Sequence, residues 1–266
     1  MAPARALALV ALATLLAVAA TGCSSKTTHH VADKNAPRVN IVFVGDSITS
    51  GSYLDPRLMP QFQGDGASHS FAARLASELP TKYPEIPWGT FTNVAVNGTT
   101  SVQWASWVHG RVAPLHPDVV VLMLGINDAI ANYEGGSESY TDFTRAYDSL
   151  VSQLTSLRNS RGRPTRLIVL TPPSATPSHA PSHNLTDARM APYVASEWAT
   201  ARAHGIPVVD IWNAWRAKHS QDGPAFGSRY YTPADGIHPN SRGQALIFDM
   251  VAPVLRTVAA ESAAGK

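Results

Sequence analysis

The chain has 266 residues, of which 44% are hydrophobic and 15% charged. This length fits one α/β domain of roughly 200 or more residues and hardly two. The formal charge of +2 is too small to indicate a nucleic-acid partner, and the apolar content argues against a disordered chain.

Residues 1–22 are predicted to form an export signal. Arg5 precedes an apolar stretch over residues 6–20, which is short for a membrane span of about 20 residues. The stretch AATGCSS that follows resembles a bacterial lipoprotein signal, in which the cysteine is lipidated and becomes the new N-terminus. Ala20 departs from the leucine that is usual in that signal. We expect lipidation of Cys23, the only cysteine of the chain, with ordinary secretion as the alternative.

Short apolar runs and longer amphipathic segments alternate after residue 37. The runs are rich in Val, Ile and Leu and are not polar at every second residue, which is typical of strands covered on both faces. Strands are predicted over residues 38–44, 91–96, 118–124, 166–171 and 206–211. Helices are predicted over residues 68–79, 140–159, 185–205 and 240–260. This alternation predicts a parallel sheet, whose ligands bind outside the carboxyl ends of the strands.

Polar residues stand directly after three predicted strands and just before the last helix. Ser47 follows the first strand in GDSIT, and Gly98 follows the second in NVAVNG. Asn127 follows the third strand in GIND. Asp235 and His238 stand together in DGIH, ahead of the last helix. Because parallel strands end at one edge of the sheet, these residues are predicted to converge on one crevice.

Ester hydrolysis by a serine requires side chains of these types. A serine hydroxyl is a weak nucleophile that needs a base within hydrogen-bond reach, and histidine suits that task near neutral pH. With a spacing of three, Asp235 can reach His238 Nδ1 within one loop and leave Nε2 facing Ser47. The backbone N–H groups of Ser47 and Gly98 and the amide of Asn127 suit the oxyanion of the tetrahedral intermediate.

The four blocks GDSIT, NVAVNG, GIND and DGIH, in this order, resemble those of the SGNH (GDSL-like) hydrolase family over roughly residues 39–258. The resemblance implies an α/β fold, a flavodoxin-like three-layer α/β/α sandwich with a mostly parallel five-stranded sheet. It implies a catalytic triad of Ser47 as nucleophile, His238 as base and Asp235 as its orienting acid. The implied oxyanion hole consists of Ser47, Gly98 and Asn127.

Other polar and aromatic residues are expected to be structural. Asp46 and Asp128, in the same blocks, are expected to hold their loops by hydrogen bonds. Several tryptophans suit an aromatic acyl or sugar site, but packing is favoured for most of them; they are Trp104, Trp107, Trp198, Trp212 and Trp215. The acyl pocket is expected to form from residues 51–67, 99–113, 129–139 and 172–184.

The expected function is that of a serine esterase that acts through an acyl-enzyme intermediate, with no cofactor and no metal. A short acyl group, such as an acetyl group on a sugar, is favoured because an exported enzyme meets polysaccharides. A lipase or lysophospholipase, an acyltransferase on the same residues, and a non-catalytic carbohydrate-binding module stay open as alternatives.

The expected organisation is a signal peptide over residues 1–22, a lipid-anchored or flexible linker over 23–37, the hydrolase domain over 38–260 and a tail over 261–266. The chain is expected to be an exported monomer, tethered through Cys23 to the outer face of a bacterial cell membrane or otherwise secreted. Its expected partner is a small-molecule or polysaccharide acyl ester, with no nucleic acid.

Overall fold

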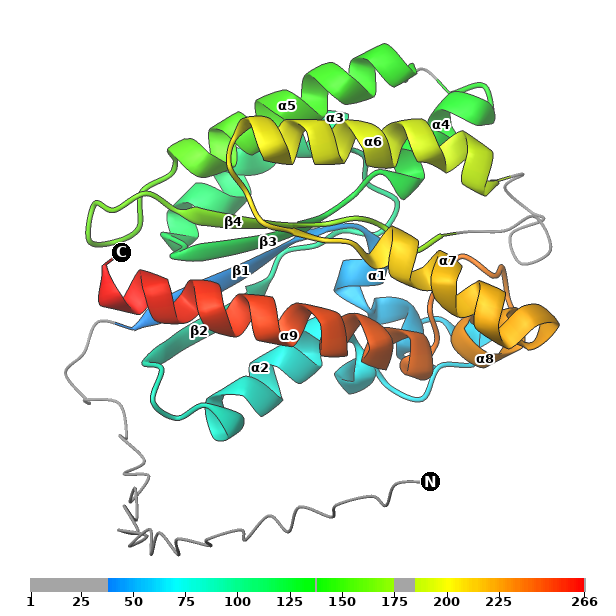
Figure 1. Cartoon of the computed structure of the whole chain (residues 1–266), viewed down its shortest axis with the longest axis horizontal. Coiled ribbons are helices and arrows are strands. Elements are labelled where there is room, and N and C mark those ends of the chain that lie inside the picture. Colours follow the sequence, from blue (N-terminus) through cyan, green and yellow to red (C-terminus); the bar gives the residue numbers. More distant parts are fainter. Residues whose placement is uncertain (1–37, 137, 175–184, 266) are drawn as a thin grey trace, which may run out of the picture.

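The computed structural model describes residues 38–136, 138–174 and 185–265 (Figure 1). The predicted signal peptide, the linker and Cys23 lie outside the described residues. Export and lipidation of the chain therefore stay predictions.

A parallel sheet of five strands forms the centre of the fold, in the order β2-β1-β3-β4-β5. The strands are β1 (Val39–Gly45), β2 (Trp88–Asn93), β3 (Val119–Met123), β4 (Arg166–Leu170) and β5 (Val208–Val209). This is the flavodoxin-like order, in which the connections reverse direction between β1 and β3. The reversal opens a crevice at the carboxyl ends of these two strands.

Helices cover both faces of the sheet and make the three layers that were predicted. They are α1 (Ser47–Ser50), α2 (Phe71–Lys82), α3 (Ser101–Trp107), α4 (Ile126–Tyr133), α5 (Tyr140–Ser156), α6 (Asp187–Ala203), α7 (Ile211–Asp222), α8 (Phe226–Tyr230) and α9 (Ser241–Ala264). Figure 1 shows α3, α5 and α6 above the sheet and α2 and α9 below it. The three-layer α/β/α prediction is thus confirmed.

The central strands are buried because helices pack on both of their faces. Every residue of β3 is at most 1% exposed, and it consists only of Val, Leu and Met. Full burial of such a side chain stabilises the fold by about 1.5–3 kcal/mol. The two strands whose carboxyl ends flank the crevice, β1 and β3, therefore form a rigid base for it.

Helix α9 is the one described helix that is long and apolar enough to cross a membrane. Half of its most apolar window is buried inside the protein, and α9 contacts four of the five strands. We assign its apolar face to the core of the fold.

The predicted bounds of the second strand are wrong. Strand β2, at the edge of the sheet, begins at Trp88 and ends at Asn93 instead of spanning 91–96. It pairs only with β1, and most of its residues are partly or fully exposed, so no continuous apolar run marks it. Backbone pairing continues past its end, where Val94 N–H donates to Phe43 O at 3.0 Å.

Helix starts differ from the predictions where a polar cap precedes the helix. The segment predicted over 68–79 begins as a helix at Phe71, after Ser70, whose hydroxyl accepts from Ala73 N–H at 3.3 Å. Helix α6 ends at Ala203, and Gly205 follows with a φ of 65°, as expected for the end of this helix.

Candidate active site

Ser47 stands at a tight junction between β1 and α1. Gly45 ends the strand, and a Cβ there would collide with the Thr49 side chain and lie 2.7 Å from Met123 O. Asp46 caps the helix, since its Oδ1 accepts from Ile48 N–H at 2.9 Å. This cap makes Ser47 the first helical residue, and its side chain reaches the crevice with 8% of the residue exposed.

Three of the predicted site residues form one chain of hydrogen bonds. Ser47 Oγ lies 2.7 Å from His238 Nε2, and His238 Nδ1 lies 2.6 Å from Asp235 Oδ2. Asp235 Oδ1 accepts from the backbone N–H groups of Ile237 at 2.9 Å and of His238 at 3.2 Å. These hydrogen bonds hold both oxygens of Asp235 in place. The two ring nitrogens of His238 are thereby directed to Asp235 and to Ser47.

The environment of Asp235 favours its charged form. Burial alone would raise the pKa of Asp235, but the hydrogen bond and charge of His238 and the two backbone donors together lower it. A charged carboxylate at this place stabilises a proton on His238 when Nε2 takes one up.

The loop that carries Asp235 and His238 is closed at its base by backbone hydrogen bonds. Thr232 N–H donates to His238 O at 2.8 Å, and Tyr231 pairs with Pro239 in an isolated antiparallel bridge. Below this pair, Asn240 caps α9 by accepting from Arg242 N–H at 3.0 Å. The core helix therefore fixes the base of the loop.

Three residues that sequence reasoning missed also hold the imidazole. The rings of Tyr53 and Phe62 lie 4.6 and 5.0 Å from the His238 ring, centroid to centroid. Tyr53 donates to Pro239 O at 2.6 Å, and Gln244 Nε2 donates to the Tyr53 hydroxyl at 2.6 Å. Gln244 is fully buried in α9, and a glutamine on the apolar face of a predicted helix is the signal that could have found it.

The predicted oxyanion donors follow the carboxyl ends of three strands, β1, β2 and β3. Asn127, in the first turn of α4, has its amide nitrogen 3.1 Å from Thr99 O and 3.4 Å from Asp46 Oδ2. Gly98 is exposed and has a φ of 73°, which suits glycine. Among the described residues, none accepts from the N–H of Gly98 or of Ser47. Both groups are thus available as donors.

Asp46 and Asp128 hold the loops of the site, as expected for structural residues. Asp128 Oδ1 accepts from Ser101 N–H at 2.9 Å and so ties α4 to the loop that contains Gly98. Burial raises the pKa of Asp46 to about 6 and that of Asp128 to about 7. Backbone hydrogen bonds and, at Asp46, the nearby His238 lower these pKa values by less than burial raises them.

Glu197 is a third buried acid behind the site, and sequence reasoning missed it. It is 0% exposed on α6, and neither carboxyl oxygen has a hydrogen-bond partner among the described residues. A Cβ on Gly125, the residue before α4, would collide with Oε1 of Glu197. Burial, with the nearby Asp128 and Asp46, raises the pKa of Glu197 well above its usual value. The Glu197 carboxyl group therefore packs directly beneath the turn that carries Asn127.

The tryptophans that were considered for an acyl or sugar site pack into or against the core. Trp104, Trp212 and Trp215 are at most 4% exposed, while Trp107 and Trp198 pack partly buried against the core. Trp104 also supports the site, since its indole N–H donates to Thr99 Oγ1 at 2.9 Å and to Gly45 O at 3.1 Å.

Comparison with known proteins identifies the family of the chain. The model of the GDSL-like Lipase/Acylhydrolase family matches residues 43–246. An acetylxylan esterase of Xylanibacter ruminicola is 23% identical over 229 residues, which are 82% of this chain and 43% of that protein. The chain thus spans less than half the length of this curated relative.

Solved structures have the same fold. The lipase/acylhydrolase from Enterococcus faecalis superposes with a TM-score of 0.62 at 21% identity, over 82% of this chain and 96% of that one. The acetylxylan esterase Axe2 from Geobacillus stearothermophilus superposes with a TM-score of 0.61 at 19% identity, over 86% of this chain and 95% of that one. These matches confirm the predicted family fold.

Proposed function

Because the chain belongs to the GDSL-like lipase/acylhydrolase family, we propose that it hydrolyses short acyl esters of saccharides, acetyl esters first among them, with Ser47 as the nucleophile. The observation that carries the proposal is the continuous hydrogen-bonded chain from Ser47 through His238 to Asp235. The expected class of enzyme, a carboxylic ester hydrolase of the GDSL type, is the class of the matched family.

The first half of the reaction forms an acyl-enzyme. Ser47 Oγ attacks the carbonyl carbon while His238 Nε2 takes the hydroxyl proton, and charged Asp235 stabilises the imidazolium. The carbonyl π electrons move to oxygen, and the N–H groups of Ser47 and Gly98 with the Asn127 amide stabilise this oxyanion. The C–O bond to the alcohol then breaks, and His238 returns the proton to the leaving oxygen.

The second half returns the free enzyme. His238 takes a proton from a water molecule, whose oxygen attacks the acyl carbon and forms a second oxyanion in the same hole. Collapse of this intermediate breaks the bond to Ser47 Oγ and releases the acid, and Ser47 regains its proton from His238.

The proposed substrate class rests on the relatives and on the predicted export of the chain. The names of the Xylanibacter and Geobacillus relatives give acetylxylan as their substrate. An exported enzyme would meet such polymers outside the cell. Lipid esters and saccharide binding without catalysis are competing functions that predict different results in the test below. Acyl transfer to a sugar is a third competing function, and it would use the same residues.

The test is a rate profile on p-nitrophenyl acetate, butyrate and laurate, joined to acetate release from acetylated xylo-oligosaccharides. We expect the wild type to prefer acetate, and the Ser47→Ala variant to lose at least about a thousandfold in kcat. The Ser77→Ala variant, which changes an exposed serine of α2 away from the site, is the matched control and should keep its activity. A preference for laurate would indicate a lipase, and an inactive wild type that binds saccharides would indicate a binding module.

A further inference from the structure

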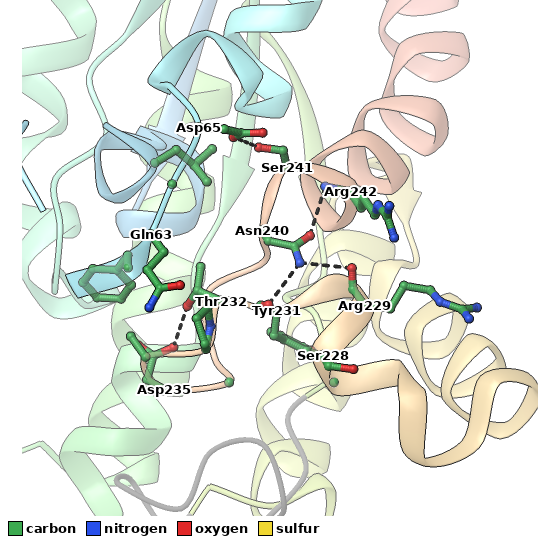
Figure 2. A pocket seen from close by; sticks show the side chains of 17 residues that line it. Gln63, Asp65, Ser228, Arg229, Tyr231, Thr232, Asp235, Asn240, Ser241 and Arg242 are labelled. Carbon is green, nitrogen blue, oxygen red and sulfur yellow. Dashed lines mark hydrogen bonds between the residues drawn. The ribbon is translucent and has the colours of Figure 1, made fainter. Parts of the chain in front are cut away.

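A pocket of about 590 Å³ lies beside the candidate active site, between the loop after α1 and the segment from α8 to the start of α9. This volume is within the range of roughly 300–1,000 Å³ that is typical of small-molecule sites. Figure 2 shows Gln63 and Asp235 on one side of it and Ser228 and Arg242 on the other. The reaction described above uses none of this space.

The position of the pocket relative to the triad excludes it as the acyl site. Asp235 lines the pocket, whereas Ser47 and His238 do not. Since His238 bridges Ser47 and Asp235, the pocket begins on the side of the triad that lies away from the nucleophile. Phe62, which contacts the His238 ring, also lines the pocket and separates the two spaces. The scissile ester must lie at Ser47, so the pocket is left for another part of the substrate.

The lining groups suit a neutral ligand with many hydroxyl groups. Gln63 offers an amide, Ser228 a hydroxyl group and Arg242 a guanidinium, while Phe62 offers an apolar ring. Among the described residues, no side-chain hydrogen bond or ion pair engages Gln63 or Arg242, so their polar atoms are free for a ligand. A pyranose has the matching pattern, with hydroxyl groups around its edge and C–H groups on its faces.

Other ligand classes fit the pocket less well. The carboxylates of Asp65 and Asp235 line it and would repel a phosphate or another anion. An acyl chain would remove polar groups such as Gln63 and Arg242 from water without replacing their hydrogen bonds. Arg229 is already paired with Asp222 at 3.1 Å, which leaves the two carboxylates of the lining facing the single guanidinium of Arg242.

We propose that this pocket is a distal saccharide subsite, which binds a neutral sugar unit of the substrate while the acylated unit lies at Ser47. The subsite rests on the proposed function, because it serves an esterase that acts on oligosaccharides or longer chains. It gives the enzyme a preference for chain length that the triad alone does not supply. Binding in the pocket also contacts the loop that carries Asp235.

The test compares substrates that reach the pocket with one that does not. Gln63→Gly suits the positive φ of that position, and Arg242→Ala keeps a good helix former at the start of α9. Ser228→Trp fills the pocket from α8. Arg256→Ala is the matched control, because Arg256 lies on α9 like Arg242 but outside the pocket.

We expect all four variants to hydrolyse p-nitrophenyl acetate within about twofold of the wild-type kcat/KM. On acetylated xylo-oligosaccharides, the wild type should gain in kcat/KM from the monosaccharide to the trisaccharide. On the trisaccharide, the three pocket variants should have a kcat/KM about five- to tenfold below that of the wild type, because their KM is higher. Arg256→Ala should keep the wild-type value.

Two results would overturn the subsite. One is a wild type that hydrolyses acetylated sugars without any dependence on chain length; the other is a set of pocket variants that keep the full gain. A wild type that cleaves p-nitrophenyl acetate but no acetylated saccharide would instead overturn the proposed substrate class, and the subsite with it. Titration of the Ser47→Ala variant with xylotriose, with and without Arg242→Ala, gives a second readout that does not depend on turnover.

Discussion

Some buried carboxyl groups at the two edges of the sheet differ in how many hydrogen-bond partners they have. At the amino edge, Asp118 precedes β3 and accepts hydrogen bonds from Arg161, from Asn159 Nδ2 at 2.6 Å and from Asn40 N–H at 2.8 Å. At the carboxyl edge, Asp128 has one unpartnered oxygen, and Glu197 has two, among the described residues.

This difference indicates that the amino edge of the sheet contributes to stability, whereas the carboxyl edge carries the candidate active site. A buried acid with a guanidinium and two further donors links its neighbours firmly, and Asp118 joins β1, β3 and the turn before β4 in this way. Buried acids without such partners cost free energy, and such groups are found where a site requires them. The carboxyl edge therefore gives up stability beside the turn that carries Asn127.

The largest expected effect on folding is at the amino edge. Asp118→Ala leaves Arg161 partly buried without its partner, and we expect a loss of about 3–5 kcal/mol in the free energy of unfolding. Urea titration measures this loss. Asp148→Ala, which removes an exposed acid 3.5 Å from His204, is the control and should change stability by less than about 1 kcal/mol. A small effect of Asp118→Ala, or a selective loss of kcat in the folded variant, would remove the contrast between the edges.

A somewhat smaller effect, on catalysis instead of folding, is expected at the carboxyl edge. Asn127→Ala removes one oxyanion donor, which is worth about 3–4 kcal/mol in the transition state, so kcat should fall by about 10²–10³. Steady-state kinetics on p-nitrophenyl acetate should find KM nearly unchanged, because the donor acts on the transition state. An unchanged kcat with a raised KM would assign Asn127 to substrate binding.

A further expected effect is a pH dependence of stability, and it concerns Glu197. Its pKa in the folded protein lies well above the usual 4.5, so the unfolded chain releases this proton at a lower pH than the folded one. Stability from the neutral acid is therefore complete below pH 4.5 and falls as the pH rises toward the folded pKa. Glu197→Gln keeps the shape and has no proton to lose.

The measurement for Glu197 is the thermal midpoint of both proteins across the pH range. The Glu197→Gln variant should match the wild type at pH 4 and become relatively more stable above pH 4.5, by at most about 1.4 kcal/mol for each pH unit. A difference between the two proteins that stays constant with pH would show that the pKa of Glu197 is not raised in the folded state.

Sequence patterns predicted the strands that are long, apolar and buried, and the site residues that stand in short blocks of neighbouring residues. The buried strands β1 and β3 were predicted within one or two residues, since helices cover both of their faces. The edge strand β2 was displaced because its exposed residues break the apolar run. Short helices such as α1 and α4 have too few turns for a helical period to be visible, although both carry residues of the site.

The supports of the site were missed because their partners are distant in the sequence. Gln244 bonds to Tyr53 across 191 residues, and Glu197 packs against Gly125 from another helix. Neither contact leaves a mark on its own segment apart from a polar residue at a buried position. By contrast, Asp235 and His238 are three residues apart, so their contact follows from local spacing.

Covalent labelling tests most directly the claim that the carboxyl edge activates Ser47. The protein is incubated with diethyl p-nitrophenyl phosphate, and its intact mass and peptides are then measured by mass spectrometry. The account predicts one diethylphosphoryl adduct, on Ser47, formed at the rate at which esterase activity is lost and absent from the Ser47→Ala variant. An adduct on another residue that tracks the loss of activity, or full inactivation without any adduct, would contradict it.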